Sequence, residues 1–152
     1  MKRLSNLLAA LVFASLVIFM SCGGGGGDDG PSDLEVAVTN LTISGGFSNP
    51  TTVTTNNGTA DGDWSSFGIS FQGNTEGGSY TVSNVPDGFS DVWSNGTWTI
   101  NNNGTVITKT QGGADTDITA QIDENFLSLS FNVDTQSGRV SGIDGSWTFV
   151  FE

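Results

Sequence analysis

The alternation of apolar and polar residues in three stretches is the feature that most limits what this chain can fold into. Apolar residues occupy every second position in residues 67–71, 127–133 and 147–151. Successive side chains of a β-strand point to opposite faces, so this pattern predicts strands with one face in the core. Residues 34–152 contain no sustained helical period and few charged helix formers. We therefore predict an all-β domain.

Weaker strand candidates lie at residues 34–44, 51–55, 79–84 and 117–122. With them, the domain contains about eight or nine mainly antiparallel strands of ordinary length. Aromatic residues make up 10% of the chain, which is enough to fill one core without disulfide bonds. Strands of this kind close into a barrel or stack as a sandwich, and periodicity does not distinguish the two.

One hairpin is specific enough to predict its register. The dipeptide Asn103-Gly104 favours a two-residue type I′ turn, in which both residues have positive φ. This turn would pair Trp98 with Lys109 across the two strands. The Lys109 ammonium would then lie against the Trp98 ring as a cation–π pair.

The N-terminal residues have the pattern of an export signal. Lys2 and Arg3 precede an apolar run at residues 7–20, and a small residue, Ser21, follows it. A membrane-spanning helix needs about 20 apolar residues, so this shorter run predicts a cleaved signal peptide. Cys22 is the only cysteine of the chain, so it has no partner for an intramolecular disulfide.

The sequence Phe-Met-Ser-Cys at residues 19–22 resembles the lipobox of bacterial lipoproteins. The resemblance implies that Cys22 becomes the mature N-terminus and carries a covalent diacylglycerol and an acyl chain, which anchor the protein in a membrane. The alternative is a plain secretory signal with an incidental cysteine. Glycines and then Asp28 and Asp29 follow Cys22, which resembles the tether of surface lipoproteins of Bacteroidota. This resemblance implies an outer-membrane location and favours the cell surface over the periplasmic face.

These features divide the chain into three segments. We predict a lipoprotein signal peptide at residues 1–21, an acylated cysteine with a flexible tether at residues 22–33, and a single β domain at residues 34–152. Glycine runs behave as flexible coils, so the tether would let the domain clear the lipid headgroups.

The second half of the β domain resembles the lipocalin-like lipoproteins of Bacteroidota. The matching stretches are GTWTINNNGTVIT at residues 96–108, DENFLSLSFNV at residues 123–133 and GIDGSWTFVFE at residues 142–152. The resemblance implies a β-barrel that binds a small ligand or serves as a component of the cell envelope.

The charge balance limits the partners of this protein. The chain has 16 acidic and 4 basic residues and a net charge of −12. So acidic a chain has no electrostatic footprint for nucleic acid and is repelled by anionic lipid. We therefore expect no nucleic-acid partner, and we expect the acyl chains, not the protein surface, to hold the protein to the membrane.

Composition also limits the chemistry. The chain has no histidine, which excludes Ser-His-Asp and Cys-His catalysis and zinc sites built from cysteine and histidine. Paired carboxylates for glycoside hydrolysis remain an alternative, but one small domain offers little room for the cleft they need. We predict a non-enzymatic protein with no catalytic residue and no cofactor beyond the lipid on Cys22.

Two pairs of aspartates are weak calcium candidates, namely Asp61 with Asp63 and Asp115 with Asp117. Calcium takes about six to eight oxygen ligands, and no stretch of the chain matches the EF-hand loop. Aspartates in turns more often hydrogen-bond to nearby backbone. We therefore expect no specific calcium site.

The candidate ligand-binding residues are Phe89, Trp93 and Trp98, in the stretch VPDGFSDVWSNGTW. Exposed rings beside asparagine and aspartate can stack on sugars, whereas such a loop more often tucks its rings over an open end of a sheet. Three functions remain open. We favour a lipoprotein that binds a small ligand or serves the envelope; the alternatives are a carbohydrate- or partner-binding adhesin module and a small carboxylate-dependent hydrolase.

Overall fold

The computed structural model describes residues 30–134 and 143–152. The chain divides into two compact units, Met1–Gly30 and Pro31–Glu152, and every described helix and strand belongs to the second. The predicted signal peptide and Cys22 lie outside the described residues. In the described part of the chain, no helix is long and apolar enough to cross a membrane.

The described residues form one α-helix and ten strands. The helix is α2 (Asp33–Leu41). The strands are β1 (Phe47–Ser48), β2 (Thr52–Thr55), β3 (Gly58–Thr59), β4 (Gly68–Asn74), β5 (Gly77–Ser83), β6 (Gly96–Ile100), β7 (Val106–Gln111), β8 (Ala114–Asp123), β9 (Phe126–Val133) and β10 (Gly145–Phe151).

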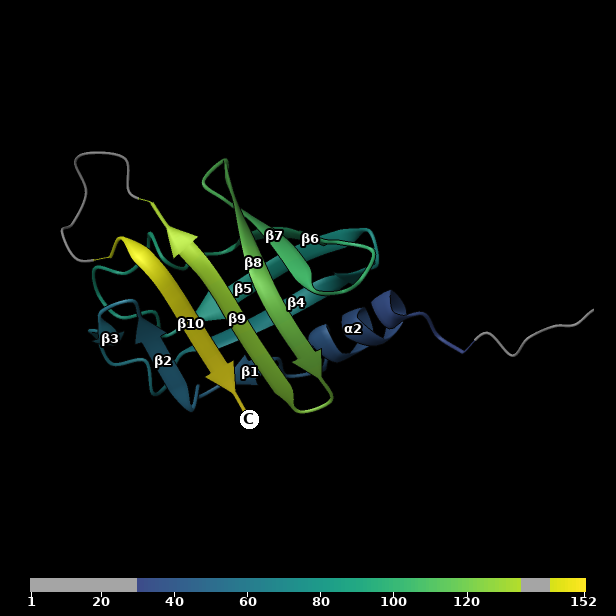
Figure 1. The fold of residues 1–152 in the computed structure, drawn as a ribbon, viewed down its shortest axis with the longest axis horizontal. Coiled ribbons are helices and arrows are strands. Elements are labelled where there is room, and N and C mark those ends of the chain that lie inside the picture. The colour runs from purple at the N-terminus through teal and green to yellow at the C-terminus, as the bar shows by residue number, and fades with distance from the viewer. Residues whose placement is uncertain (1–29, 135–142) are drawn as a thin grey trace, which may run out of the picture. The chain divides into compact units, whose positions relative to one another are not determined.

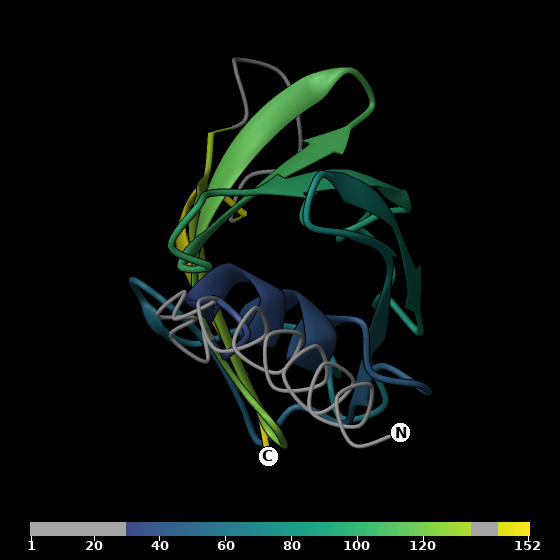
Figure 2. The same ribbon diagram turned by 90° about the vertical axis from the view of Figure 1, so that its right-hand side faces the viewer.

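The ten strands form a single antiparallel sheet in the order β1-β4-β5-β6-β7-β8-β9-β10-β2-β3. The sheet curls around its own core as a half-barrel, which Figure 2 shows most clearly. The predicted all-β, antiparallel fold is therefore confirmed, and of the two architectures left open the curled sheet is closer to the barrel. The neighbours β10 and β2 lie far apart in the sequence, so their pairing ties the end of the domain to its beginning.

The predicted strand at residues 34–44 is wrong, because most of this segment is helix α2. Ser32 and Glu35 form a capping box, in which the Ser32 backbone N–H donates to Glu35 Oε2 at 2.8 Å and the Glu35 N–H donates to Ser32 Oγ at 3.3 Å. Ala37, Val38 and Leu41 lie on the buried face of the helix. The helix thus includes Asp33, the last residue of the segment predicted as the tether, and Ser32 caps it.

Helix α2 covers one end of the curled sheet (Figures 1 and 2). It packs against β8 and against the turn between β6 and β7, where a Cβ atom on Gly104 would lie 2.6 Å from the Ala37 Cβ. Glycine at this position is therefore required both by its φ of 69° and by the approach of the helix.

The predicted hairpin register is confirmed, since Trp98 pairs with Lys109. The predicted turn type is wrong, because Gly104 has positive φ and Asn103 does not. Asn101 explains the difference. Its side-chain oxygen accepts hydrogen bonds from the backbone N–H groups of Thr105 at 2.9 Å and Val106 at 3.0 Å, which stabilise a longer turn.

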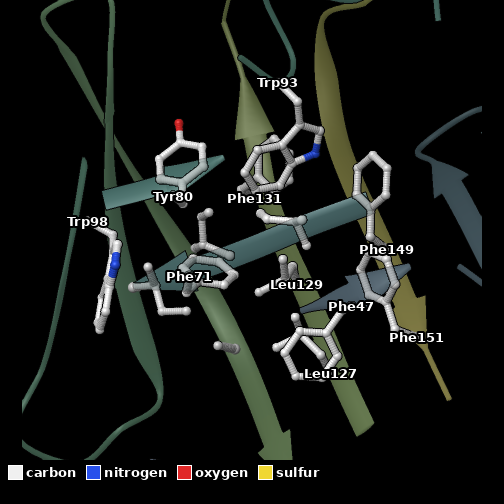
Figure 3. Close-up of a cluster of buried hydrophobic side chains, with 14 of the residues drawn as sticks. Phe47, Phe71, Tyr80, Trp93, Trp98, Leu127, Leu129, Phe131, Phe149 and Phe151 are labelled. Carbon is white, nitrogen blue, oxygen red and sulfur yellow. The ribbon is translucent and has the colours of Figure 1, made fainter. Parts of the chain in front are cut away.

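The core lies on the concave face of the sheet and is rich in aromatic rings (Figure 3). The inward residues of β9, Leu127, Leu129 and Phe131, are all buried, as the alternation predicts. The Trp64 ring packs edge-on against Phe149 at 5.0 Å between centroids. Such pairs contribute roughly 0.5–1.5 kcal/mol beyond the burial of their area.

Candidate functional site

Strands β8 and β9 separate toward the end of the sheet that lies away from helix α2. Their pairing stops at Ile118 and Phe131, although β8 begins earlier, at Ala114, and β9 continues to Val133 (Figure 1). A cavity of about 650 Å³ lies between the separated strands and the loop that precedes β6. Its lining includes Ser90, Asp91, Ser94, Lys109, Gln111, Ala114, Thr116, Asn132 and Asp134.

Lys109 is the most unusual residue of this cavity. Within residues 30–134 and 143–152 it is the only buried charged side chain, at 4% exposure. Its ammonium donates hydrogen bonds to the Val92 carbonyl at 2.5 Å and to Gln111 Oε1 at 3.4 Å. It also lies 4.3 Å from the centroid of the Trp93 ring and 4.7 Å from that of Phe131. These groups are all neutral, and burial lowers the pKa of Lys109 to about 8.

The cation–π pair predicted between Lys109 and Trp98 is wrong, because the ammonium lies against Trp93 instead. Trp98 is Lys109's neighbour across the strands, but its ring is directed elsewhere. The Trp98 indole N–H donates to the carbonyls of Gln72 at 3.2 Å and Ser79 at 3.1 Å, which holds the ring toward β4 and β5.

Gln111, which the sequence did not indicate, fixes the loop that forms one wall of the cavity. Its side-chain N–H donates to the Ser90 carbonyl at 2.9 Å and to the Asp91 carbonyl at 3.3 Å, and its oxygen accepts from the Ser94 N–H at 3.1 Å. The only feature of the sequence that could have indicated Gln111 is its spacing from Lys109, since residues 109 and 111 lie on the same face of β7. Together the two side chains hold the loop to the sheet.

The three candidate ligand-binding rings belong to the core rather than to an exposed patch. Trp93 and Trp98 are each 1% exposed, so neither can stack on a sugar at the surface. Phe89 is partly buried and packs edge-on against Trp64 at 5.4 Å. The loop before β6 therefore tucks Phe89 and Trp93 into the core, in line with the second of the two interpretations drawn from the sequence, and Trp98 lies on β6 itself.

Two buried polar groups have no hydrogen-bond partner among the described residues, Tyr80 Oη and Trp93 Nε1. Their rings contact each other at 5.9 Å (Figure 3). Tyr80 faces Gly96 across β5 and β6, and a Cβ atom on Gly96 would lie 2.8 Å from the Tyr80 oxygen. The missing side chain of Gly96 thus makes room for the phenol. Burial raises the pKa of Tyr80 to about 12, so it is a hydrogen-bond donor at neutral pH.

The aspartates considered for calcium have local roles. The Asp63 carboxylate accepts hydrogen bonds from Ser65 Oγ at 2.6 Å and from its N–H at 3.0 Å, which lower the pKa of Asp63. Asp115 and Asp117 accept from the hydroxyls of threonines on β7 at 2.6 and 2.7 Å. The backbone carbonyl of Asp61 accepts from the Trp64 indole N–H. In the described part of the chain, no three histidine, cysteine, aspartate or glutamate residues are grouped to hold a metal ion.

The fold and the site together define an antiparallel half-barrel with a polar cavity at one end and a buried lysine in its wall. No protein-family model matches this chain, and no curated protein or solved structure is significantly similar to it.

Proposed function

We propose that this protein is a lipid-anchored outer-membrane lipoprotein whose β domain binds a small polar ligand in the cavity between β8 and β9. The observation that carries the proposal is the buried Lys109 ammonium in the cavity wall. The described groups around the ammonium are all neutral, and a buried charge in such surroundings is unfavourable. A fold that keeps such a charge beside a cavity is therefore well suited to bind a polar molecule there.

The size and the construction of the cavity support the binding proposal. Ligand pockets commonly measure about 300–1,000 Å³ and carry a few polar groups that orient the ligand. This cavity measures about 650 Å³. Gln111 already fixes the loop that forms one wall, so binding a ligand would cost little conformational entropy.

The sequence pattern at Cys22 supports the anchoring proposal. A basic start, a short apolar run and a lipobox-like cysteine precede the β domain. The net charge of −12 disfavours direct contact with anionic lipid, so covalent acyl chains would have to supply the attachment.

The binding proposal is tested by filling the cavity. Ala114 lines the cavity from β8, so Ala114→Trp should block it and abolish binding of hits from a small-molecule library screened by ligand-observed NMR. Thr119→Trp is the matched control, because Thr119 is an exposed residue of the same strand and does not line the cavity. If every compound that binds the wild-type protein also binds Ala114→Trp, or if no compound binds at all, the proposal is refuted.

The anchoring proposal is tested with Cys22→Ala. The wild-type protein should incorporate labelled palmitate and partition into detergent, and the variant should do neither. Protease treatment of intact cells, followed by blotting for the β domain, then distinguishes the two membrane faces. Identical labelling of both proteins would refute lipidation at Cys22.

A further inference from the structure

The Lys109 ammonium has more hydrogen-bonding capacity than its neighbours use. An ammonium carries three N–H donors. The described residues supply two acceptors, the Val92 carbonyl at 2.5 Å and the more distant Gln111 Oε1 at 3.4 Å. Lys109 also lines the cavity, so a ligand oxygen can accept a further hydrogen bond from it. Hydrogen bonds between an ammonium and an anionic oxygen are about twice as strong as neutral ones.

The rest of the cavity wall indicates how much charge the ligand carries. Asp134 lines the same cavity, and the whole chain has a net charge of −12. These charges disfavour a ligand with two or more negative charges, such as a phosphate ester. A single carboxylate, placed on the ammonium, fits this balance best.

The uncharged part of the wall indicates the body of the ligand. Ser90, Ser94, Thr116 and Asn132 bring hydroxyl and amide side chains to the cavity. Such groups hydrogen-bond to hydroxyls, as in sugars and other polyols. Among the described lining residues only Ala114 and Val133 are apolar, which is too little apolar surface to favour a fatty acid.

We infer that the cavity binds a small sugar acid, a polyhydroxylated molecule with one carboxylate, and that this carboxylate accepts a hydrogen bond from the Lys109 ammonium. The inference rests on the proposed ligand-binding function and names the class of ligand.

The test compares three probes on the whole protein, purified in detergent. Glucuronate carries one carboxylate, glucose has no charge, and glucose 1-phosphate carries two negative charges near neutral pH. We expect glucuronate to bind at least about tenfold more tightly than glucose or glucose 1-phosphate, the difference that one charge-assisted hydrogen bond provides.

Lys109 itself supplies a readout that needs no mutation. The chain contains only Lys2 and Lys109 as lysines, so the Lys109 side-chain signal can be assigned by NMR. An anion on the ammonium stabilises its protonated form. Saturating glucuronate should therefore raise the Lys109 pKa above its value of about 8, whereas glucose should leave it unchanged.

A variant completes the experiment. Lys109→Met keeps an unbranched side chain, one atom shorter, and removes the charge, so the affinity for glucuronate should fall to that for glucose. Glucuronate that does not bind, or that binds without raising the Lys109 pKa, overturns this inference whether or not Lys109→Met folds. The proposed function is refuted by a different result, namely that no library compound loses its binding in Ala114→Trp.

Discussion

The Lys109 ammonium lies 4.3 Å from the centroid of the Trp93 ring, and this contact joins strand β7 to the loop before β6. The same ammonium donates to the carbonyl of Val92, the residue before Trp93. A lysine that is only 4% exposed has lost most of its hydration, which the ring and the carbonyl replace in part. This relationship determines how the protein responds to pH.

Stability against unfolding should rise between pH 8 and 10. The pKa of Lys109 is about 8 in the folded protein against 10.5 for an unperturbed lysine, so over this interval the unfolded chain binds more protons. Burial of the ammonium lowers the free energy of unfolding. This cost disappears as Lys109 loses its proton, so the free energy of unfolding rises by roughly 2 kcal/mol over the interval.

Urea unfolding at several pH values measures this effect. Lys109→Met is the control, because it cannot titrate and its stability should change little over the interval. Equal pH dependence in the two proteins would show that Lys109 titrates alike in the folded and unfolded states. The measurement should stay below pH 10, since Tyr80, whose pKa rises to about 12 on folding, begins to oppose the trend there.

Removal of the Tyr80 hydroxyl should not destabilise the protein. The oxygen is buried without a partner among the described residues, so Tyr80→Phe removes a desolvated polar group and should be neutral or stabilising by about 1 kcal/mol. Trp98→Phe is the contrast, because it removes an indole N–H with two acceptors and should cost about 2 kcal/mol. A loss above about 1 kcal/mol in Tyr80→Phe would mean that a bound water or ligand satisfies the hydroxyl.

Gly96→Ala should be strongly destabilising, by about 3 kcal/mol or more. The new Cβ would collide with the backbone carbonyl of Thr110 on β7 and lie 2.8 Å from Tyr80 Oη. Gly88→Ala is the control: its φ is +88°, but nothing lies within 4 Å of the added carbon. We expect about 1–2 kcal/mol there, from backbone strain alone. Thermal unfolding of both variants compares them, and equal losses would contradict the crowding at Gly96.

Ser32→Ala should destabilise helix α2 by about 1 kcal/mol, because it removes half of the capping box. The hydrogen bonds from Ser32 lower the pKa of Glu35. The ionised carboxylate therefore stabilises the folded protein fully above its ordinary pKa of 4.5, and this stabilisation is lost as pH falls through the lowered pKa. Ser44→Ala, in the turn beyond the helix, is the control. Amide hydrogen exchange across α2 should accelerate only in Ser32→Ala.

Much of the sheet could be read from local pattern. The alternation in β4, β9 and β10 predicts which side chains enter the core, because a strand's two faces follow directly from its period of two. The register that pairs Trp98 with Lys109 also followed from a short hairpin. Helix α2 was missed, although Ser32 and Glu35 have the spacing of a capping box, because its buried stripe is only about two turns long.

The candidate site was not predictable in the same way. Trp93, Trp98 and Phe89 looked like binding residues, because exposure is a property of the whole fold and not of a sequence window. The cavity wall contains Lys109 and Gln111 instead, whose partners are backbone carbonyls of the loop at residues 90–94. Backbone atoms carry no sequence signal, so these contacts could not be foreseen.

By itself, the sequence determined that the folded domain is an antiparallel β structure, because side-chain alternation is a local property of each strand. Tertiary structure alone decided where β8 and β9 part. The apolar pattern of β8 and the apolar pattern of β9 give no sign that pairing stops at Ile118 and Phe131. The curl of the sheet and the loop held by Lys109 and Gln111 bring three distant segments around that gap, and only their packing makes it a cavity.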